Sequence, residues 1–168
     1  YYDTPGTPGK KSISLGLGET KITRKVKSLD IIIKTCTKVN LVTQNKRRIF
    51  EEKKSEYTFR TVNSLISSAK DLRKKYKDIP IKFSVIDVNS AEMDIEKISS
   101  KITKENFDLK FFSIEGSKNN ENNMASTMAS IRKSFECVKN CNDLIYFVED
   151  DYIHKKEALA EMVFAYEK

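Results

Sequence analysis

Residues 29–34 read LDIIIK, a short and nearly continuous apolar run. A run of this length and composition is typical of a strand that is buried on both faces of a parallel sheet. Three further runs have the same character, at residues 81–88 (IKFSVIDV), 107–114 (FDLKFFSI) and 144–148 (LIYFV). The four runs therefore predict four strands of one sheet.

Amphipathic segments separate the predicted strands. Their large apolar residues lie mostly three or four positions apart, which is the spacing of one helix face. We predict helices within residues 59–76, 95–102, 124–138 and 159–166. Asn89, with Glu92 three positions on, predicts a capping box at the start of the second helix. Strand and helix alternate through four units, so we expect an α/β fold, a mostly parallel Rossmann-like sheet with helices on both faces.

The composition predicts one globular domain preceded by an arm. The chain has 168 residues, 39% hydrophobic and 33% charged, and no apolar run approaches the length of a transmembrane helix. Residues 1–27 hold most of the glycines and few large apolar groups, so we expect an irregular basic arm there and the domain at residues 28–168. Cys36, Cys137 and Cys141 are an odd number of cysteines without a Cys-x-x-Cys pair, which indicates reduced thiols and a cytoplasmic protein.

The net charge of +7 bears on the class of partner. The lysines of the chain are spread along the sequence among acidic residues, whereas the positive charge of a nucleic-acid groove is gathered on one face. We therefore expect no nucleic-acid partner. A phosphate-bearing ligand and peripheral contact with an anionic membrane surface both suit this charge.

Ligands of parallel α/β sheets bind at the carboxyl ends of the strands. This rule selects four short segments, at Thr35 to Thr37, Asp87 to Ser90, Glu115 to Gly116 and Glu149 to Asp151. His154, the only histidine, comes just after the acidic segment and near the start of the last helix, where a lone histidine is more often exposed than functional, so we expect it to be exposed.

The acidic triplet Glu149, Asp150 and Asp151 predicts a metal site. One acid can stabilise the start of the last helix, but two like charges about 4 Å apart repel by about 4 kcal/mol at an effective dielectric constant of about 20. A divalent cation such as Mg²⁺ or Mn²⁺ reverses that repulsion because it prefers carboxylate oxygens. On an extended backbone Glu149 and Asp151 would point the same way, so we predict them as the ligands and Asp150 as their support. Helix capping and simple solvation remain the alternatives.

Taken in order, these segments resemble the nucleotide-sugar-dependent glycosyltransferases of the GT-A fold, most closely the family 2 type. LDIIIKTCT is similar to the first strand and nucleotide loop of that family, and VIDVNS to the end of its second strand. LIYFVEDDYIHKKEAL is similar to the strand, Asp-x-Asp motif and helix that follow. Asn63-Ser64-Leu65 also falls where the first helix of such enzymes often carries Ser-Leu.

The resemblance implies roles for individual residues. Thr35, Cys36 and Thr37 would line the nucleotide, and Asp87 would contact its base, most often uracil. Glu149 and Asp151 would bridge a Mn²⁺ or Mg²⁺ ion to the diphosphate of a UDP-sugar, with Asp150 in support. Residues 28–168 would then be the nucleotide-sugar-binding part of a metal-dependent glycosyltransferase with an unknown acceptor.

The chain departs from the family pattern in several respects, two of which bear most on the site. Glu149 stands where the family has aspartate, and the sequence stops one helix after the acidic motif. We therefore expect a truncated domain, whose acceptor-binding half and catalytic base would lie beyond Lys168.

Two other functions remain open. A nucleotidyltransferase or other metal-dependent phosphate enzyme would use the same sheet, although residues 35–45 lack the glycines of its usual loop. A non-catalytic basic binding module is the second alternative. Its expected interleaving of arginine with aromatic residues is weak in this chain, which has no tryptophan.

Overall fold

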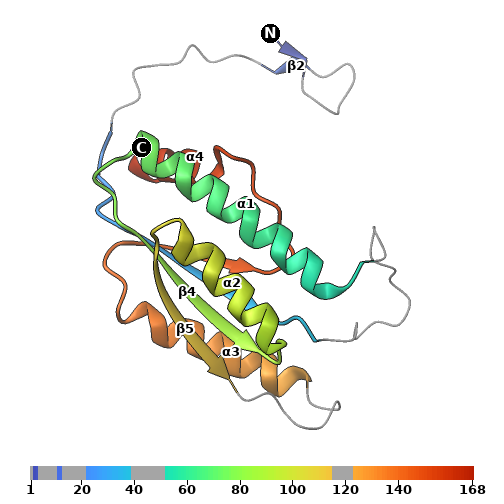
Figure 1. Ribbon diagram of the computed structural model, residues 1–168. Coiled ribbons are helices and arrows are strands. Elements are labelled where there is room, and N and C mark those ends of the chain that lie inside the picture. Colours follow the sequence, from blue (N-terminus) through green and yellow to red (C-terminus); the bar gives the residue numbers. More distant parts are fainter. Residues whose placement is uncertain (1, 4–10, 13–21, 39–51, 115–122) are drawn as a thin grey trace.

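The computed structural model describes residues 2–3, 11–12, 22–38, 52–114 and 123–168. Its centre is a four-stranded sheet in the order β5-β4-β3-β6, in which every neighbouring pair is parallel (Figure 1). The strands of this sheet are β3 (Leu29–Thr35), β4 (Ile81–Val88), β5 (Asp108–Ile114) and β6 (Leu144–Glu149). The helices are α1 (Lys54–Lys75), α2 (Glu92–Lys104), α3 (Asn123–Val138) and α4 (Ala158–Glu167). The two short strands β1 (Tyr2–Asp3) and β2 (Lys11–Ser12) pair with each other, antiparallel.

This architecture confirms the predicted α/β fold with a parallel sheet. The four predicted strands all form, and β3 and β6 each run one residue further than expected, to Thr35 and Glu149. The first helix begins earlier than its apolar stripe suggested, at Lys54. Its last turn carries Arg73, Lys74 and Lys75, whose charges suit the negative end of the helix dipole.

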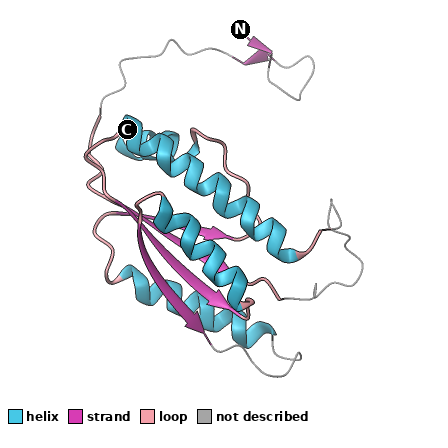
Figure 2. Ribbon diagram, viewed as in Figure 1, coloured by secondary structure: helices cyan, strands magenta, loops and turns pink. Residues whose placement is uncertain are grey.

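Helices cover both faces of the sheet (Figure 2). Helices α1, α2 and α4 pack together on one face and α3 lies on the other. Strand β3 serves both layers because its successive side chains point to opposite faces: Ile31 and Ile33 join the core under α1, and Ile32 joins a smaller cluster under α3. Burying one such aliphatic side chain contributes about 1.5–3 kcal/mol, so the apolar run of β3 is the main anchor of both layers.

The strand order changes direction between β3 and β6. From β3 the chain moves through α1 to β4 and through α2 to β5, always toward the same edge. Helix α3 then crosses on the opposite face and returns the chain to β6, on the other side of β3. In open α/β sheets this switch point opens a crevice at the carboxyl ends of the two strands, where ligands bind.

The predicted capping box at the start of α2 is wrong. Ala91 occupies the N-cap position and α2 has no side-chain cap. Asn89 instead has a φ of 60°, in the left-handed region that asparagine tolerates better than most residues. The sharp turn after β4 needs that conformation, and it takes Asn89 away from the helix end.

Serine hydroxyls of α1 fix the segment between β6 and α4. The Ser64 hydroxyl accepts a hydrogen bond from the His154 backbone N–H at 3.0 Å, and the Ser68 hydroxyl accepts one from the Leu159 N–H at 3.0 Å. His154 is half-buried, and its Nε2 lies 2.9 Å from the Tyr146 hydroxyl. The expectation that His154 is exposed is therefore wrong, because the hydrogen bond to Ser64 holds the His154 backbone against α1.

The residues just before β3 also pack on the domain. The backbone N–H groups of Thr23 and Arg24 donate to the Glu167 carbonyl at the end of α4, at 2.9 and 3.3 Å. Val26, which is 2% exposed, joins the core under α1. These contacts place the end of the predicted arm alongside the C-terminal helix.

Candidate functional site

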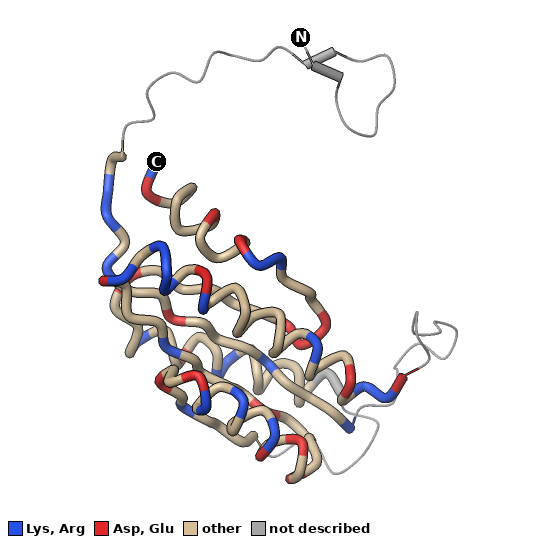
Figure 3. Tube along the Cα trace, turned by 45° about the horizontal axis from the view of Figure 1, so that its top comes forward, with Lys and Arg blue, Asp and Glu red and all other residues tan. Residues whose placement is uncertain are grey.

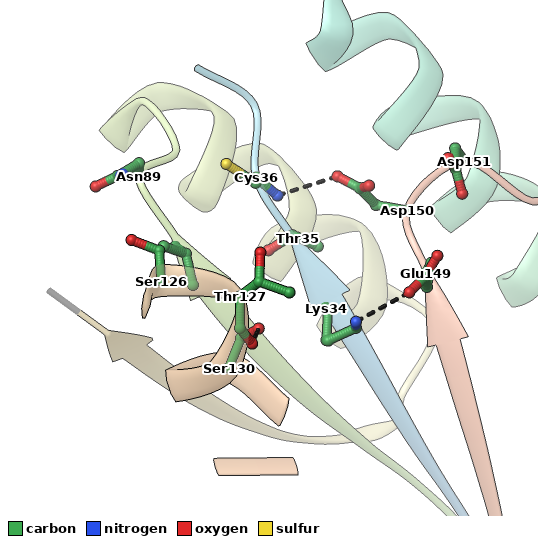
Figure 4. Close-up of a pocket in the computed structure, with 11 residues that line it drawn as sticks. Lys34, Thr35, Cys36, Asn89, Ser126, Thr127, Ser130, Glu149, Asp150 and Asp151 are labelled. Carbon is green, nitrogen blue, oxygen red and sulfur yellow. Dashed lines mark hydrogen bonds and ion pairs between the residues drawn. The ribbon is translucent and has the colours of Figure 1, made fainter. Parts of the chain in front are cut away.

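A pocket of about 260 Å³ lies at the switch point between β3 and β6. It opens where the two strands end, between the turn after β4 and the first turns of α3 (Figure 4). Its lining residues are Lys34, Thr35, Cys36, Val88, Asn89, Ser126, Thr127, Ser130, Glu149, Asp150 and Asp151. The structure thus brings the predicted nucleotide loop and the predicted acidic motif to one place.

Strand alternation divides the site residues between the two faces of the sheet. Lys34 and Glu149 are register partners on neighbouring strands and share the α3 side with Ile32. Thr35 and Asp87 are also register partners, but they share the α1 side with Ile33. Residues that are adjacent in the sequence are therefore separated by the sheet.

Asp87 is buried, with 2% of its surface exposed. One of its carboxylate oxygens accepts a 2.7 Å hydrogen bond from the Thr35 hydroxyl, and the other accepts a 3.2 Å bond from the Ser90 backbone N–H. A buried carboxylate needs such donors, since an unpaired charge is costly to desolvate. Asp87 is not one of the residues lining the pocket, and its predicted contact with a base stays a prediction.

Thr37 joins the loop after β3 to the turn after β4. Its backbone N–H donates to the Ser90 hydroxyl at 2.9 Å, and its own hydroxyl accepts from the Ala91 N–H at 3.1 Å. These two bonds hold the loop that was predicted to line a nucleotide against the start of α2. Thr37 itself does not border the pocket.

Asp150 is the buried member of the acidic triplet, with 9% of its surface exposed. Its carboxylate accepts hydrogen bonds from the Cys36 backbone N–H at 3.0 Å, the Thr58 hydroxyl at 2.8 Å and the Lys54 ammonium at 2.6 Å. Figure 4 shows its side chain pointing toward Cys36. Asp150 thus ties the turn after β6 to the end of β3 and to the first two turns of α1.

Glu149 and Asp151 are both exposed. Glu149 forms an ion pair with Lys34, whose Nζ lies 3.0 Å from the Glu149 Oε1 atom. The premise that the three acids alternate along an extended backbone is wrong, because β6 ends at Glu149 and the next two residues form a turn. The directions of Asp150 and Asp151 follow from that turn.

The Cys36 thiol at the pocket wall is held in its protonated form. Burial raises its pKa to about 11, and the negative charges of Asp150 and Asp87 act in the same direction. A thiol with this pKa is a poor nucleophile at neutral pH. Cys36 therefore contributes two things to the site: the backbone N–H that holds Asp150, and a small apolar surface.

The described residues contain no preformed cluster of three or more metal-ligating side chains. Asp150 already accepts from three donors, so the acids exposed for coordination are Glu149 and Asp151. Mg²⁺ is usually held by one or two carboxylates together with substrate phosphates, and less often by an all-protein cage. A metal ion held by Glu149 and Asp151 stays a prediction.

Several pocket residues were not found from the sequence. Lys34 ends the first apolar run and could have been found from its position at a strand end. Ser126, Thr127 and Ser130 come from α3, and small polar residues on a helix carry no signal of their own. Glu115 and Gly116, which were also candidates, lie outside the described residues.

Helices α1, α2 and α3 carry charges of both signs, whereas α4 carries only acidic ones (Figure 3). None of them is both long enough and apolar enough to cross a bilayer. The chain matches no family model, no curated protein and no solved structure.

Proposed function

We propose that residues 28–168 bind a nucleotide-diphosphate sugar at the β3–β6 pocket together with Mn²⁺ or Mg²⁺, as the donor-binding part of a glycosyltransferase. One observation carries the proposal. The end of β3 and the acids after β6 meet in a pocket at the topological switch point of a parallel sheet, which is the usual ligand position in this architecture. The order of motifs along the chain, which resembles GT-A enzymes, supports the same choice.

In this proposal Glu149 and Asp151 hold the metal ion against the diphosphate. The ion would neutralise the diphosphate and stabilise it as the leaving group. Asp150 keeps the two ligands in place because its own oxygens bind the surrounding fold. A role of this kind requires the Asp150 contacts to persist when the donor binds.

Asp87 and the residues after β3 are the proposed contacts for the nucleoside. Each carboxylate oxygen has two lone pairs, so Asp87 keeps acceptor capacity beyond its bonds to Thr35 and Ser90. For a uracil N–H to use that capacity, the base would have to separate the loop after β3 from the turn after β4, which the Thr37 bonds to Ser90 and Ala91 hold together. Residues 39–51 of that loop lie outside the described residues.

Titration calorimetry with UDP-sugars, with and without Mn²⁺, tests the proposal. We expect binding that needs the metal and that weakens about tenfold or more in Glu149→Ala and Asp151→Ala, since each loses a charged ligand. Glu161→Ala is the matched control, because Glu161 is an exposed acid on α4 and its loss should change the affinity less than twofold. Equal binding without metal, or no binding at all, contradicts the proposal. Tighter binding of nucleoside triphosphates than of UDP-sugars would instead favour a nucleotidyltransferase.

A further inference from the structure

Lys34 is the charged pocket residue among those that no sequence motif singled out. It lies one residue before the end of β3, and its ammonium nitrogen is 3.0 Å from the Glu149 Oε1 atom on the neighbouring strand. The two side chains are 26% and 56% exposed. Among the described residues that line the pocket, Lys34 is the only cation. Figure 4 shows the pair at the base of the pocket, with Thr127 and Ser130 of α3 nearby.

The ion pair conflicts with a metal ion on Glu149. A divalent cation there would lie close to the Lys34 ammonium, and their repulsion would be twice that of two unit charges at the same distance. Lysine can resolve the conflict because its four-carbon stem is flexible and its ammonium group donates in three directions. The Lys34 head group would then need another anion within its reach.

We propose that Lys34 exchanges partners when the donor binds: it neutralises Glu149 in the free protein and binds the diphosphate once the metal occupies Glu149. The proposal rests on the function proposed above and names a further residue for the same site. Lysine is a common phosphate ligand, acting as a point charge. The second ammonium group near the triplet, on Lys54, stays with Asp150 at 2.6 Å and keeps the turn after β6 in place.

This exchange has a consequence that a purely structural ion pair does not have. Removing the Lys34 charge removes the competitor of the metal and also removes a ligand of the diphosphate. The affinities for metal and for nucleotide should therefore change in opposite directions. A pair that only stabilises the edge of the sheet would leave both affinities unchanged, because exposed ion pairs contribute little even to folding.

The decisive variant is Lys34→Gln, which keeps most of the side-chain length without the charge. Binding of Mn²⁺ alone, followed by electron paramagnetic resonance, should become about threefold to fivefold tighter, the scale of an exposed ion pair. Binding of UDP at saturating Mn²⁺, followed by calorimetry, should become about tenfold weaker or more, the scale of a charged hydrogen bond. Lys34→Arg should keep most of the UDP affinity. Lys104→Gln, at an exposed lysine on α2, is the matched control and should change neither affinity.

A second variant tests the exchange by removing the charge of Glu149 in place of that of Lys34. Glu149→Gln releases Lys34 without changing the shape of the pocket, so UDP without metal should bind this variant more tightly than it binds the wild type. In the double variant with Lys34→Gln that gain should disappear.

The outcomes separate the two proposals. If the wild-type chain binds no UDP in the presence of Mn²⁺, the proposed function fails and the exchange fails with it. If the wild-type chain binds UDP with Mn²⁺, but Lys34→Gln shifts both affinities in one direction or neither by more than twofold, the exchange is overturned and donor binding stands.

Discussion

Replacing Asp150 by alanine should destabilise the chain far more than replacing its neighbour Asp151. Asp150 is 9% exposed, and its carboxylate accepts from the Cys36 N–H, the Thr58 hydroxyl and the Lys54 ammonium. Asp151 is exposed and belongs to the same turn. The two substitutions remove the same chemical group from adjacent positions, so the difference between them measures burial and hydrogen bonding.

The size of the effect depends on whether each of the three donors finds another acceptor once the Asp150 carboxylate is removed. Hydrogen bonds to a charged group contribute about 1.5–3 kcal/mol each, so three of them set an upper bound of several kcal/mol. Thr58 can fall back on the Lys54 carbonyl, 3.3 Å away, and the Lys54 ammonium can turn to water because its side chain is 17% exposed. The Cys36 N–H is part-buried and loses a charged acceptor, which is the largest remaining cost. We therefore expect a loss of about 3 kcal/mol for Asp150→Ala, and about 0.5 kcal/mol or less for Asp151→Ala.

Urea denaturation followed by circular dichroism measures both values. In a chain of this length 1 kcal/mol corresponds to about 2–4 °C in Tm, so Asp150→Ala should melt about 6–12 °C below the wild type. Asp150→Asn keeps the volume but turns one acceptor into a donor that faces other donors, and it should fall between the wild type and Asp150→Ala. Equal stability of Asp150→Ala and Asp151→Ala would refute the assignment of Asp150 as the residue that holds the turn.

Three further predictions concern the scaffold of the site. Thr35→Val removes a hydrogen bond to the buried Asp87 carboxylate and should cost about 1.5–3 kcal/mol in urea denaturation, while Thr35→Ser should recover most of it. Ser68→Ala leaves the first buried backbone N–H of α4 without its acceptor and should cost about 1–3 kcal/mol, with faster hydrogen exchange in α4, whereas Ser67→Ala, at an exposed position on the same helix, should be neutral. Burial lowers the pKa of His154, so the folded chain binds fewer protons than the unfolded chain just below pH 6.5, and stability should fall as the pH drops through that value. Melting curves of His154→Gln should lack this part of the pH dependence, and an unchanged dependence would contradict it.

The strands and helices were predictable because their signals are local. The apolar run of β3 and the stripe of α1 are each contained in one segment, and burial on both faces follows from the run itself. The position of the pocket was predictable for the same reason, since it depends only on where the strands end. These rules identified Thr35, Cys36 and the acidic triplet as residues of one edge, and the pocket contains them.

Which residues of that edge are buried and which form ion pairs was not predictable. Asp150 is buried because Lys54 and Thr58 reach it from α1, more than ninety positions earlier in the chain. Lys34 and Glu149 meet because α3 returns the chain to the far side of β3. A local sequence pattern does not indicate contacts between segments that are far apart in the chain. The error at Asn89 has the same origin, because the turn after β4 is shaped by hydrogen bonds to the loop after β3.

In the folded chain, ion pairs offset the mutual repulsion of the carboxylates in the acidic triplet. Lys54 neutralises Asp150 and Lys34 neutralises Glu149, so the three carboxylates and two ammonium groups together carry one net negative charge, and Asp151 is the acid without an ion-pair partner among the described residues. A site with that charge repels a diphosphate. Under the proposed function, one bound divalent cation would change the net charge of the same groups to one positive, and Lys34 would be released on the pocket side. The metal dependence of nucleotide binding would then follow from the charge of the whole cluster as well as from direct coordination. It should persist, although weakened, in a variant such as Asp151→Asn that retains one metal ligand.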